Sequence, residues 1–373
     1  MRRVRYVHLL DLLDARGDSV QGMFRKEQRI FGGGGELNSV GRSPALTDVE
    51  GLLVGHYTDA EAATGCTVVL APADGMRASA YVRGRATGTR ELDALSPHHL
   101  VPAVNAILLT GGSAFGLGAA DGVMRWLAER GRGFPVGVGV VPIVPAAVIF
   151  DLAPLGLPDR WPEAEHGYLA CERAGRDFEE GSVGAGTGAT VGKVLGAKSA
   201  MKGGVGTWSV AAGELIVGAL AVVNAFGDVR GADGRILAGA RGDEGWVDAA
   251  RYLALGGKPA GSFSRPGANT TLVVVGTNAR IDRLGLYQVA KMAADALSWR
   301  ITPVGTAVDG DVVFAVSCGA VEVKDSMAVE LLAQQAVAMA IERAVTTAKG
   351  TPEIPGLADR FGSAPGVAEQ TEC

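Results

Sequence analysis

Apolar runs that glycine interrupts at short intervals most constrain how this chain can fold. Two such runs are VGALAVVNAFG (217–227) and TLVVVGTNA (271–279), and glycine supplies 55 of the 373 residues. Glycine is enriched in low-complexity disordered chains and also in folds with tight turns and close backbone packing. Here the glycines punctuate runs rich in β-branched residues, and 47% of the chain is hydrophobic. The pattern therefore favours closely packed strands around a large core.

Strand-like and helix-like segments alternate through the chain from about residue 46. The runs typical of strands cover 64–72, 76–84, 105–112, 203–229, 270–279 and 312–319. Helical spacing is found over 116–131, 283–300 and 326–350, and the loop-rich connector 228–268 contains a short helix near 244–255. This order predicts an α/β fold with mixed strands, in which helices cover a sheet sandwich.

The two ends of the chain differ in character. Residues 1–45 hold a charged amphipathic piece, GGGG and a polar stretch, so we expect a flexible arm ahead of a single domain over 46–373. The N-terminus lacks the apolar core and cleavage site of a signal peptide, and we expect a cytoplasmic protein. The net charge of −5 argues against nucleic acid or a membrane surface as the main partner.

Three familiar motifs are only partly present. GAGTGA (184–189) fits a loose dinucleotide-binding pattern but lacks the expected strand before it and helix after it. Gly192-Lys193 resembles the end of a phosphate-binding loop, but Thr187 and Val194 occupy positions that the motif requires to be glycine and a hydroxyl residue. GGSAFG (111–116) has Phe115 where a nucleophile elbow needs glycine.

Histidine and cysteine also fail to form a recognisable site. The five histidines lack metal-ligand spacing, and no C-x-x-C pair is present. We therefore expect neither a metal nor another cofactor, and we expect the cysteines to be reduced and structural. The cysteines are Cys66, Cys171, Cys318 and Cys373.

A different catalytic possibility lies in PGANTTLVVVGTNA, where a hydroxyl residue opens an apolar strand. Threonine at a strand start is ordinarily structural, because β-branched residues favour strands. Alternatively, Thr270 attacks the carbonyl of Asn269, and the chain breaks between the two residues. The freed α-amine has a pKa of roughly 7.7–8.0, so one residue would supply both nucleophile and base.

Nine segments together resemble the DmpA-type self-processing aminopeptidases (L-aminopeptidase/D-esterase), a family that includes the nylon-oligomer (6-aminohexanoate-oligomer) hydrolases. The likeness covers about 46–360. The segments are VGHYTD, GTRELD, LLTGGSAFGLGAADGVMRWL, VPIVPAAVIFDL, VGAGTGATVGK, KGGVGT, GALAVVNAFGDV, NTTLVVVGTNA and VDGDVVFAVSCG. The resemblance implies an α/β/β/α-like sandwich similar to N-terminal-nucleophile hydrolases but differently connected. It also implies self-cleavage into 1–269 and 270–373, and a homotetramer of the processed pairs.

The resemblance also implies roles for the catalytic residues. Thr270 matches the nucleophile, which is serine in some members and threonine in the nylon-oligomer branch. Asn224 matches an amide that helps to bind the oxyanion. Lys193 matches a lysine near the nucleophile, whose charge would keep the Thr270 amine neutral. Asp309 and Asp311 match an acidic pair that orients the nucleophile and its amine; otherwise DGD is an ordinary turn.

Substrate-binding residues follow less directly from the resemblance. Gly111, Gly112 and Ser113 match a substrate-cleft loop, although simple packing is the alternative for Ser113. Phe150 stands where the nylon-oligomer branch carries a tyrosine that reaches the site. The missing hydroxyl argues against nylon-like specificity but leaves the amide chemistry in place.

The predicted substrates are small peptides, amino-acid amides or esters, and short oligoamides. Whether the enzyme acts at a chain end or within a chain is left open. The alternative is an unprocessed, non-catalytic member that binds small amines or serves as a scaffold.

Overall fold

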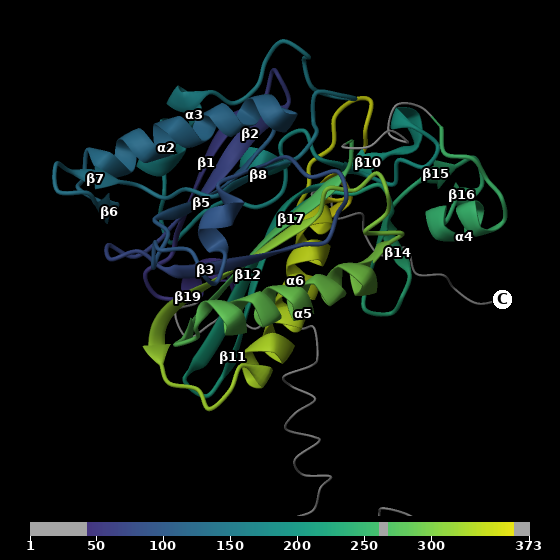
Figure 1. Ribbon diagram of the computed structural model, residues 1–373. Coiled ribbons are helices and arrows are strands. Elements are labelled where there is room, and N and C mark those ends of the chain that lie inside the picture. Colours follow the sequence, from purple (N-terminus) through teal and green to yellow (C-terminus); the bar gives the residue numbers. More distant parts are fainter. Residues whose placement is uncertain (1–42, 261–267, 362–373) are drawn as a thin grey trace, which may run out of the picture. The chain divides into compact units, whose positions relative to one another are not determined.

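The computed structural model describes residues 43–260 and 268–361, so the arm predicted over 1–45 lies almost wholly outside the described residues. Residues 44–361 contain two five-stranded sheets and several helices (Figure 1). Among the described residues, no helix combines the length and apolar character that a membrane span requires.

The first sheet has the order β1-β2-β5-β8-β4. These strands are β1 (Leu53–Asp59), β2 (Thr64–Leu70), β5 (Ala106–Thr110), β8 (Ala146–Val148) and β4 (Thr89–Arg90). The second sheet has the order β11-β12-β17-β19-β3. Its strands are β11 (Gly204–Ala212), β12 (Leu215–Asn224), β17 (Thr270–Ala279), β19 (Val312–Val321) and β3 (Arg77–Val82).

Sheets and helices form four layers here, and an apolar cluster lies between each layer and the next. One cluster joins the inner faces of the two sheets, for example Leu109 of β5 with Leu272 of β17. A second lies between the first sheet and helices α2 (Ala119–Ala128) and α3 (Ala164–Glu172). The third lies between the second sheet and helices α5 (Arg283–Arg300) and α6 (Met327–Thr346). This is the predicted α/β/β/α sandwich (Figure 1).

Smaller elements connect the layers. They are β6 (Phe134–Pro135), β7 (Val140–Val141), β9 (Thr190–Val191), β10 (Met201–Lys202), β13 (Asp228–Arg230), β14 (Ile236–Ala238), β15 (Arg241–Gly242), β16 (Gly245–Trp246), β18 (Ile301–Thr302), α4 (Ala249–Ala254) and α7 (Ala358–Phe361), with 3-10 helices η2 (Leu46–Asp48), η3 (Leu92–Leu95), η4 (Ser113–Gly118), η5 (Gly184–Gly186) and η6 (Ala197–Ser199). The short helix α4 lies inside the predicted connector, near the expected position.

The central strands of the second sheet bring the ends of three segments together. β12 pairs antiparallel with β17, so that Asn224 is the partner of Thr270. β17 pairs in parallel with β19, and an isolated bridge joins Asn269 to Asp309 just before the two strands begin. Valine and alanine side chains alternate between the two faces of β12 and β17, and both faces are buried. This register therefore fixes where Thr270 lies.

Most of the predicted elements are found, and two have the predicted bounds. β17 and α5 span the predicted ranges, and the Asp282 side chain caps α5 by accepting a hydrogen bond from Gly285 N at 2.8 Å. α6 ends at Thr346 and not near residue 350. There the hydroxyls of Thr346 and Thr347 donate to helix carbonyls, which ends the regular pattern.

The sequence patterns did not predict α3, and glycine explains why. A Cβ at Gly167 would lie 1.9 Å from Ala119 O, and one at Gly122 would lie 1.6 Å from Ala164 O. Helices α2 and α3 therefore pack closely enough to require glycine at both positions, although glycine is a poor helix former. In the described part of the chain Cys66, Cys171 and Cys318 are free, and Cys373 lies outside it.

Candidate active site

Thr270 is the first residue of β17, and its hydroxyl lies against the peptide bond that precedes it. Thr270 Oγ1 donates to Asn269 O at 2.6 Å, and Gly310 N donates to the same oxygen at 2.8 Å. The Asn269 carbonyl oxygen therefore accepts one hydrogen bond from a hydroxyl and one from a backbone amide. An amide that binds this oxygen also stabilises the negative charge that nucleophilic attack would place on it.

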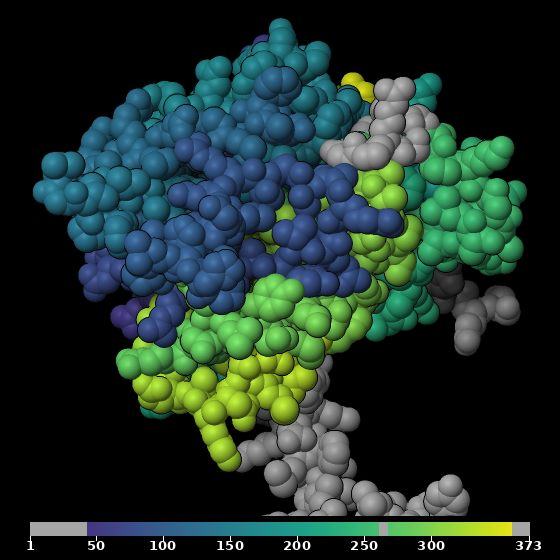
Figure 2. All heavy atoms as spheres, in the orientation of Figure 1, coloured from purple at the N-terminus to yellow at the C-terminus, as the bar shows by residue number. Residues whose placement is uncertain are grey.

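Thr270 is only 2% exposed, yet it lines a pocket of about 280 Å³. Ser113, assigned by resemblance to a substrate-cleft loop, lines the same pocket, together with Ala86, Thr87, Gly88, Ala114 and Val148. In Figure 2, blue residues of the N-terminal half lie directly beside the green and yellow-green residues of the C-terminal part, which form the lower part of this face. The nucleophile candidate is thus buried but remains in contact with a cavity.

Asn224 is fixed on three sides. Its Oδ1 accepts from Lys193 Nζ at 2.8 Å and from Thr190 N at 3.1 Å, and its Nδ2 donates to Phe150 O at 2.9 Å. Phe150, predicted to line the cleft with its side chain, thus contacts the site through its backbone carbonyl. One Nδ2 hydrogen is held by that carbonyl, and the amide has a second hydrogen that it can donate.

Lys193 connects Asn224 to Ala268, which lies two residues before Thr270. It is fully buried, and besides its bond to Asn224 Oδ1 its Nζ donates to Asn224 O at 3.1 Å and to Ala268 O at 3.4 Å. Burial lowers the pKa of Lys193 to about 7, against smaller opposing effects of Asp309 and Asp151. Burial thus disfavours the ammonium form of Lys193, whereas the three oxygen acceptors on its Nζ favour it.

The two aspartates of DGD hold backbone around the site. Asp311 Oδ1 accepts from Thr271 N at 2.7 Å, and its Oδ2 accepts from Gly305 N at 3.2 Å. Asp309 Oδ2 accepts from both the N and Oγ1 of Thr306, at 2.8 and 2.7 Å. Burial, followed by the charge of Asp309, raises the pKa of Asp311. The pair therefore positions β17 and the turn at 305–306 through these bonds.

The sequence patterns did not single out Asp151, which follows Phe150. Its Oδ1 accepts from Gly112 N at 2.6 Å and its Oδ2 from Thr64 Oγ1 at 2.8 Å. A Cβ at Gly111 would lie 2.1 Å from Asp151 Oδ2, so this glycine makes room for the carboxylate. The Asp151 carboxylate thus holds the backbone of Gly112 and lies close to Gly111. Burial raises the pKa of Asp151 to about 6.

A second buried lysine also escaped the sequence patterns. Lys202 Nζ donates to Thr187 O at 2.6 Å and to Ala189 O at 2.9 Å, and burial lowers its pKa to about 7. A lysine beside glycines in KGGVGT offers no pattern that distinguishes a buried amine from an exposed one. Its burial depends on how the glycine-rich 184–189 segment folds over it.

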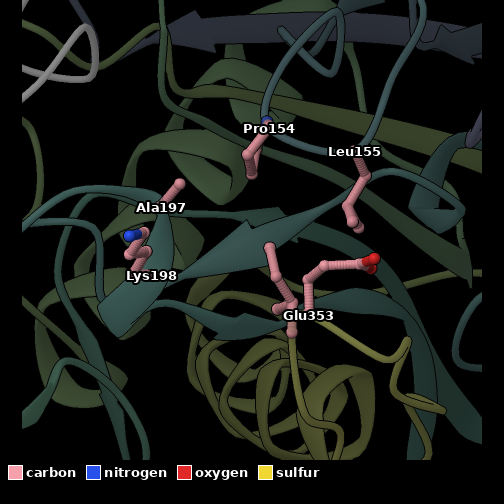
Figure 3. Close-up of a pocket in the computed structure, with 6 residues that line it drawn as sticks. Pro154, Leu155, Ala197, Lys198 and Glu353 are labelled. Carbon is pink, nitrogen blue, oxygen red and sulfur yellow. The ribbon is translucent and has the colours of Figure 1, made fainter.

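A larger pocket, of about 440 Å³, contains none of the predicted site residues. It is lined by Pro154, Leu155, Ala197, Lys198, Glu353 and Ile354. The charged heads of Lys198 and Glu353 point in different directions (Figure 3), so they do not converge on one ligand. Within 43–260 and 268–361, no group of histidine, cysteine and acidic side chains is arranged to hold a metal ion.

Comparison with known proteins gives a consistent result. The family model described as Peptidase family S58 matches residues 44–353. An uncharacterized aminopeptidase of Mycobacterium tuberculosis is 40% identical over 356 residues, covering 86% of this chain and 98% of the relative. A 6-aminohexanoate-oligomer endohydrolase of Kocuria is 30% identical over 300 residues, covering 77% and 81%.

A solved structure has the same fold. The l-aminopeptidase d-ala-esterase/amidase from Ochrobactrum anthropi, described as a new variant among the Ntn hydrolase fold, aligns with a TM-score of 0.64 and 19% identity. The alignment covers 85% of this chain and 94% of that one. The family model and the relatives show that this chain is an amide-hydrolysing enzyme and belongs to peptidase family S58.

Proposed function

We propose that this protein is an autoprocessing N-terminal-nucleophile amide hydrolase whose nucleophile is Thr270. The observation that carries the proposal is the geometry of one peptide bond. Thr270 Oγ1 lies 2.6 Å from Asn269 O, and Gly310 N lies 2.8 Å from the same oxygen. The hydroxyl is thus held beside the carbonyl that it would attack, with an amide donor already on the oxygen.

Self-cleavage would proceed by an N→O acyl shift. Thr270 Oγ1 bonds to the carbonyl carbon of Asn269 and gives up its proton, and Gly310 N stabilises the resulting oxyanion. The bond from that carbon to the Thr270 nitrogen then breaks, and the nitrogen takes a proton to become an amine. Water hydrolyses the ester, which leaves a carboxylate on Asn269 and restores the Thr270 hydroxyl. No free amine exists before this step, so a buried group must accept the first proton. Lys193, with a pKa of about 7 and a bond to Ala268 O, is the candidate for that role.

The mature enzyme would use the same groups on an external amide. The Thr270 amine would take the hydroxyl proton, since an unperturbed α-amine has a pKa of roughly 7.7–8.0. The second hydrogen of Asn224 Nδ2 and the Gly310 amide would bind the oxyanion. Asp311 would keep β17 in position through its bond to Thr271 N.

The substrates we propose are small peptides, amino-acid amides or esters, and short oligoamides. The names of the relatives, an aminopeptidase and an oligomer endohydrolase, support this range. We further propose a homotetramer of processed pairs that works in the cytoplasm, needs no cofactor, and has neither nucleic acid nor membrane as a partner. The alternative of a non-catalytic member does not agree with the aminopeptidase and oligomer-hydrolase relatives, and the pocket that Thr270 lines also favours the enzyme.

Substitution of Thr270 tests the proposal. Thr270→Ala removes the hydroxyl, and we expect loss of both self-cleavage and hydrolysis of amides. Thr270→Ser keeps the hydroxyl and removes only the β-branch, so we expect both activities to persist at a reduced rate. Cleavage after Asn269 in the alanine variant would mean that another group is the nucleophile.

A further inference from the structure

Phe150 and Asp151 follow one another in the chain and contact two different parts of the site. Phe150 O accepts a hydrogen bond from Asn224 Nδ2 at 2.9 Å, and Asp151 Oδ1 accepts one from Gly112 N at 2.6 Å. Asn224 is the amide that we propose for the oxyanion, and Gly112 belongs to the cleft loop. Since one planar peptide bond joins the two acceptor residues, a displacement of Asp151 would also move the carbonyl that holds Asn224.

The cleft loop is bonded to the same segment a second time, on the other side of Phe150. Ser113 N donates to Ile149 O at 3.0 Å. Gly112 and Ser113 both have positive φ angles, of 78° and 52°, a conformation that is common for glycine and unfavourable for serine. Serine keeps such a backbone only where its surroundings hold it there. The bonds that flank Phe150 do so, and they fix residues 149–151 against the loop.

The Asp151 carboxylate has little room to move. Asp151 is 1% exposed, and its Oδ2 accepts from Thr64 Oγ1 at 2.8 Å. A Cβ at Gly111 would lie 2.1 Å from Asp151 Oδ2, and one at Gly188 would lie 2.7 Å from the Asp151 Cβ. Both glycines therefore bring backbone closer to this side chain than another residue would allow. A carboxylate that is enclosed in this way and bonded through both oxygens is a rigid anchor for its own backbone.

The other end of the Asn224 amide is held by a second backbone segment, which Lys202 supports. Lys202 Nζ donates to Ala189 O at 2.9 Å, and the residue after Ala189 donates Thr190 N to Asn224 Oδ1 at 3.1 Å. Asp151 and Lys202 thus each fix one of the two segments that orient Asn224.

We propose that Asp151 is a positioning residue for hydrolysis: its carboxylate fixes residues 149–151 against the cleft loop and so holds the Phe150 carbonyl on Asn224. Asp151 touches no reacting atom in this proposal. It acts through the orientation of the Asn224 amide, whose second Nδ2 hydrogen would bind the oxyanion. The inference rests on the proposed function, because it concerns the oxyanion amide of that site.

Two substitutions test the anchor. Asp151→Ala removes both acceptor oxygens. For an amino-acid p-nitroanilide that the wild-type protein hydrolyses, we expect kcat/KM to fall about 10²-fold, the loss that a misplacement of about 1 Å can cause. Asp151→Asn keeps one acceptor for Gly112 N and offers a donor to the Thr64 hydroxyl, so we expect a smaller loss, of about tenfold. Unchanged hydrolysis in Asp151→Ala would overturn the inference.

A double-mutant cycle with Asn224→Ala tests whether Asp151 acts through the amide. Without the amide Asp151 has nothing to position, so Asp151→Ala should lower kcat/KM less than about threefold in the Asn224→Ala background. A merely structural role predicts the same factor in both backgrounds. That result, or a double variant without detectable activity, would overturn the inference. If Asp151→Ala does not fold, Asp151→Asn takes its place, with expected losses of about tenfold alone and less than about twofold in the Asn224→Ala background.

Asp228→Ala is the matched control for burial and hydrogen bonding. Asp228 is also fully buried, and its carboxylate accepts from Ala240 N at 2.7 Å and from Ala249 N at 2.6 Å. Neither bond involves the cleft loop or Asn224. We expect both alanine variants to be less stable to denaturant, and Asp228→Ala to keep kcat/KM within about threefold of the wild type. An equal loss of activity in the two variants would attribute the effect to lowered stability and would overturn the inference.

Self-cleavage separates this inference from the proposed function. In that step the oxyanion forms on Asn269 O, to which Gly310 N already donates, so Asp151→Ala should be cut after residue 269 like the wild type. A folded Asp151→Ala chain that is not cut would overturn the inference, because Asp151 would then act on more than the amide. Wild-type protein that stays in one piece and is inactive contradicts the proposed function, and the inference with it. Intact mass distinguishes these cases.

Discussion

A methyl group at Gly310 offers a sharp test of the self-cleavage geometry. A Cβ there would lie 2.8 Å from Thr270 Oγ1 and 2.6 Å from Ala86 O. The backbone of Gly310 lies outside the left-handed region that favours glycine, and Gly310→Ala keeps the amide that binds Asn269 O. The substitution therefore crowds both the Thr270 hydroxyl and the backbone of Ala86.

The size of the effect follows from these contacts. An ordinary carbon–oxygen contact is roughly 3.4 Å or more, so the hydroxyl must move by about half an ångström or more. A displacement of about 1 Å costs up to about 10²-fold in rate, so we expect self-cleavage to slow by about 10- to 100-fold. Hydrolysis by any matured enzyme should fall by a similar factor.

Cell-free synthesis followed by a time course on denaturing gels would measure the cleavage rate. Gly175→Ala is the control, because its nearest added contact is an ordinary one, 3.5 Å from Asp177 O. Self-cleavage of Gly310→Ala at the wild-type rate would refute the reasoning, because crowding the Thr270 hydroxyl would then have no effect on the attack.

Other expectations follow from the same site. Asn224→Ala should slow turnover by about 10²–10³-fold and also lower the free energy of unfolding by about 1–3 kcal/mol, measured by denaturant titration, because it leaves buried partners of the amide unsatisfied. Asp311→Asn replaces one acceptor oxygen by a donor and should slow both self-cleavage and hydrolysis; normal processing would reduce it to a turn residue. In kcat/KM profiles on a small amide, activity should rise with pH through the neutral range as the Thr270 amine loses its proton, with no effect of a chelator; a flat profile down to about pH 5 would exclude the amine as base. The buried amine of Lys202 has a pKa of about 7 when folded and 10.5 when unfolded, so the unfolded state binds more protons between these values. Lys202 should therefore raise the free energy of unfolding by up to about 1.4 kcal/mol per pH unit from pH 7 to 10, and Lys202→Met should remove this part of the rise, while the part due to Lys193 remains.

The sequence predicted the elements whose patterns are strong and local. β17 and α5 have the predicted bounds because local sequence sets them. β17 is a run of β-branched residues, and α5 is an alanine-rich segment with an N-terminal cap. α3 and β1 went unpredicted, because their stability depends on neighbours. Gly167 fits α3 closely against α2, and β1 is an edge strand with mixed burial.

The sequence was sufficient to predict several residues of the site, but most contacts between them could not be predicted from it. The resemblance brought Thr270, Asn224 and Lys193 together, and hydrogen bonds and strand pairing join these three in the structure. Gly310 and Asp151 were not singled out, because a backbone amide and a carboxylate turned inward leave no side-chain signature in a sequence. Their roles depend on which backbone atoms the two sheets bring within hydrogen-bonding distance.

The central claim is that the Asn269–Thr270 bond breaks and exposes a catalytic threonine. Intact mass and N-terminal sequencing of the purified protein test this most directly. We predict two polypeptides, residues 1–269 and 270–373, with the smaller beginning Thr-Thr-Leu and remaining bound through the buried strand β17. A single uncleaved chain that hydrolyses amides at full rate would contradict the account.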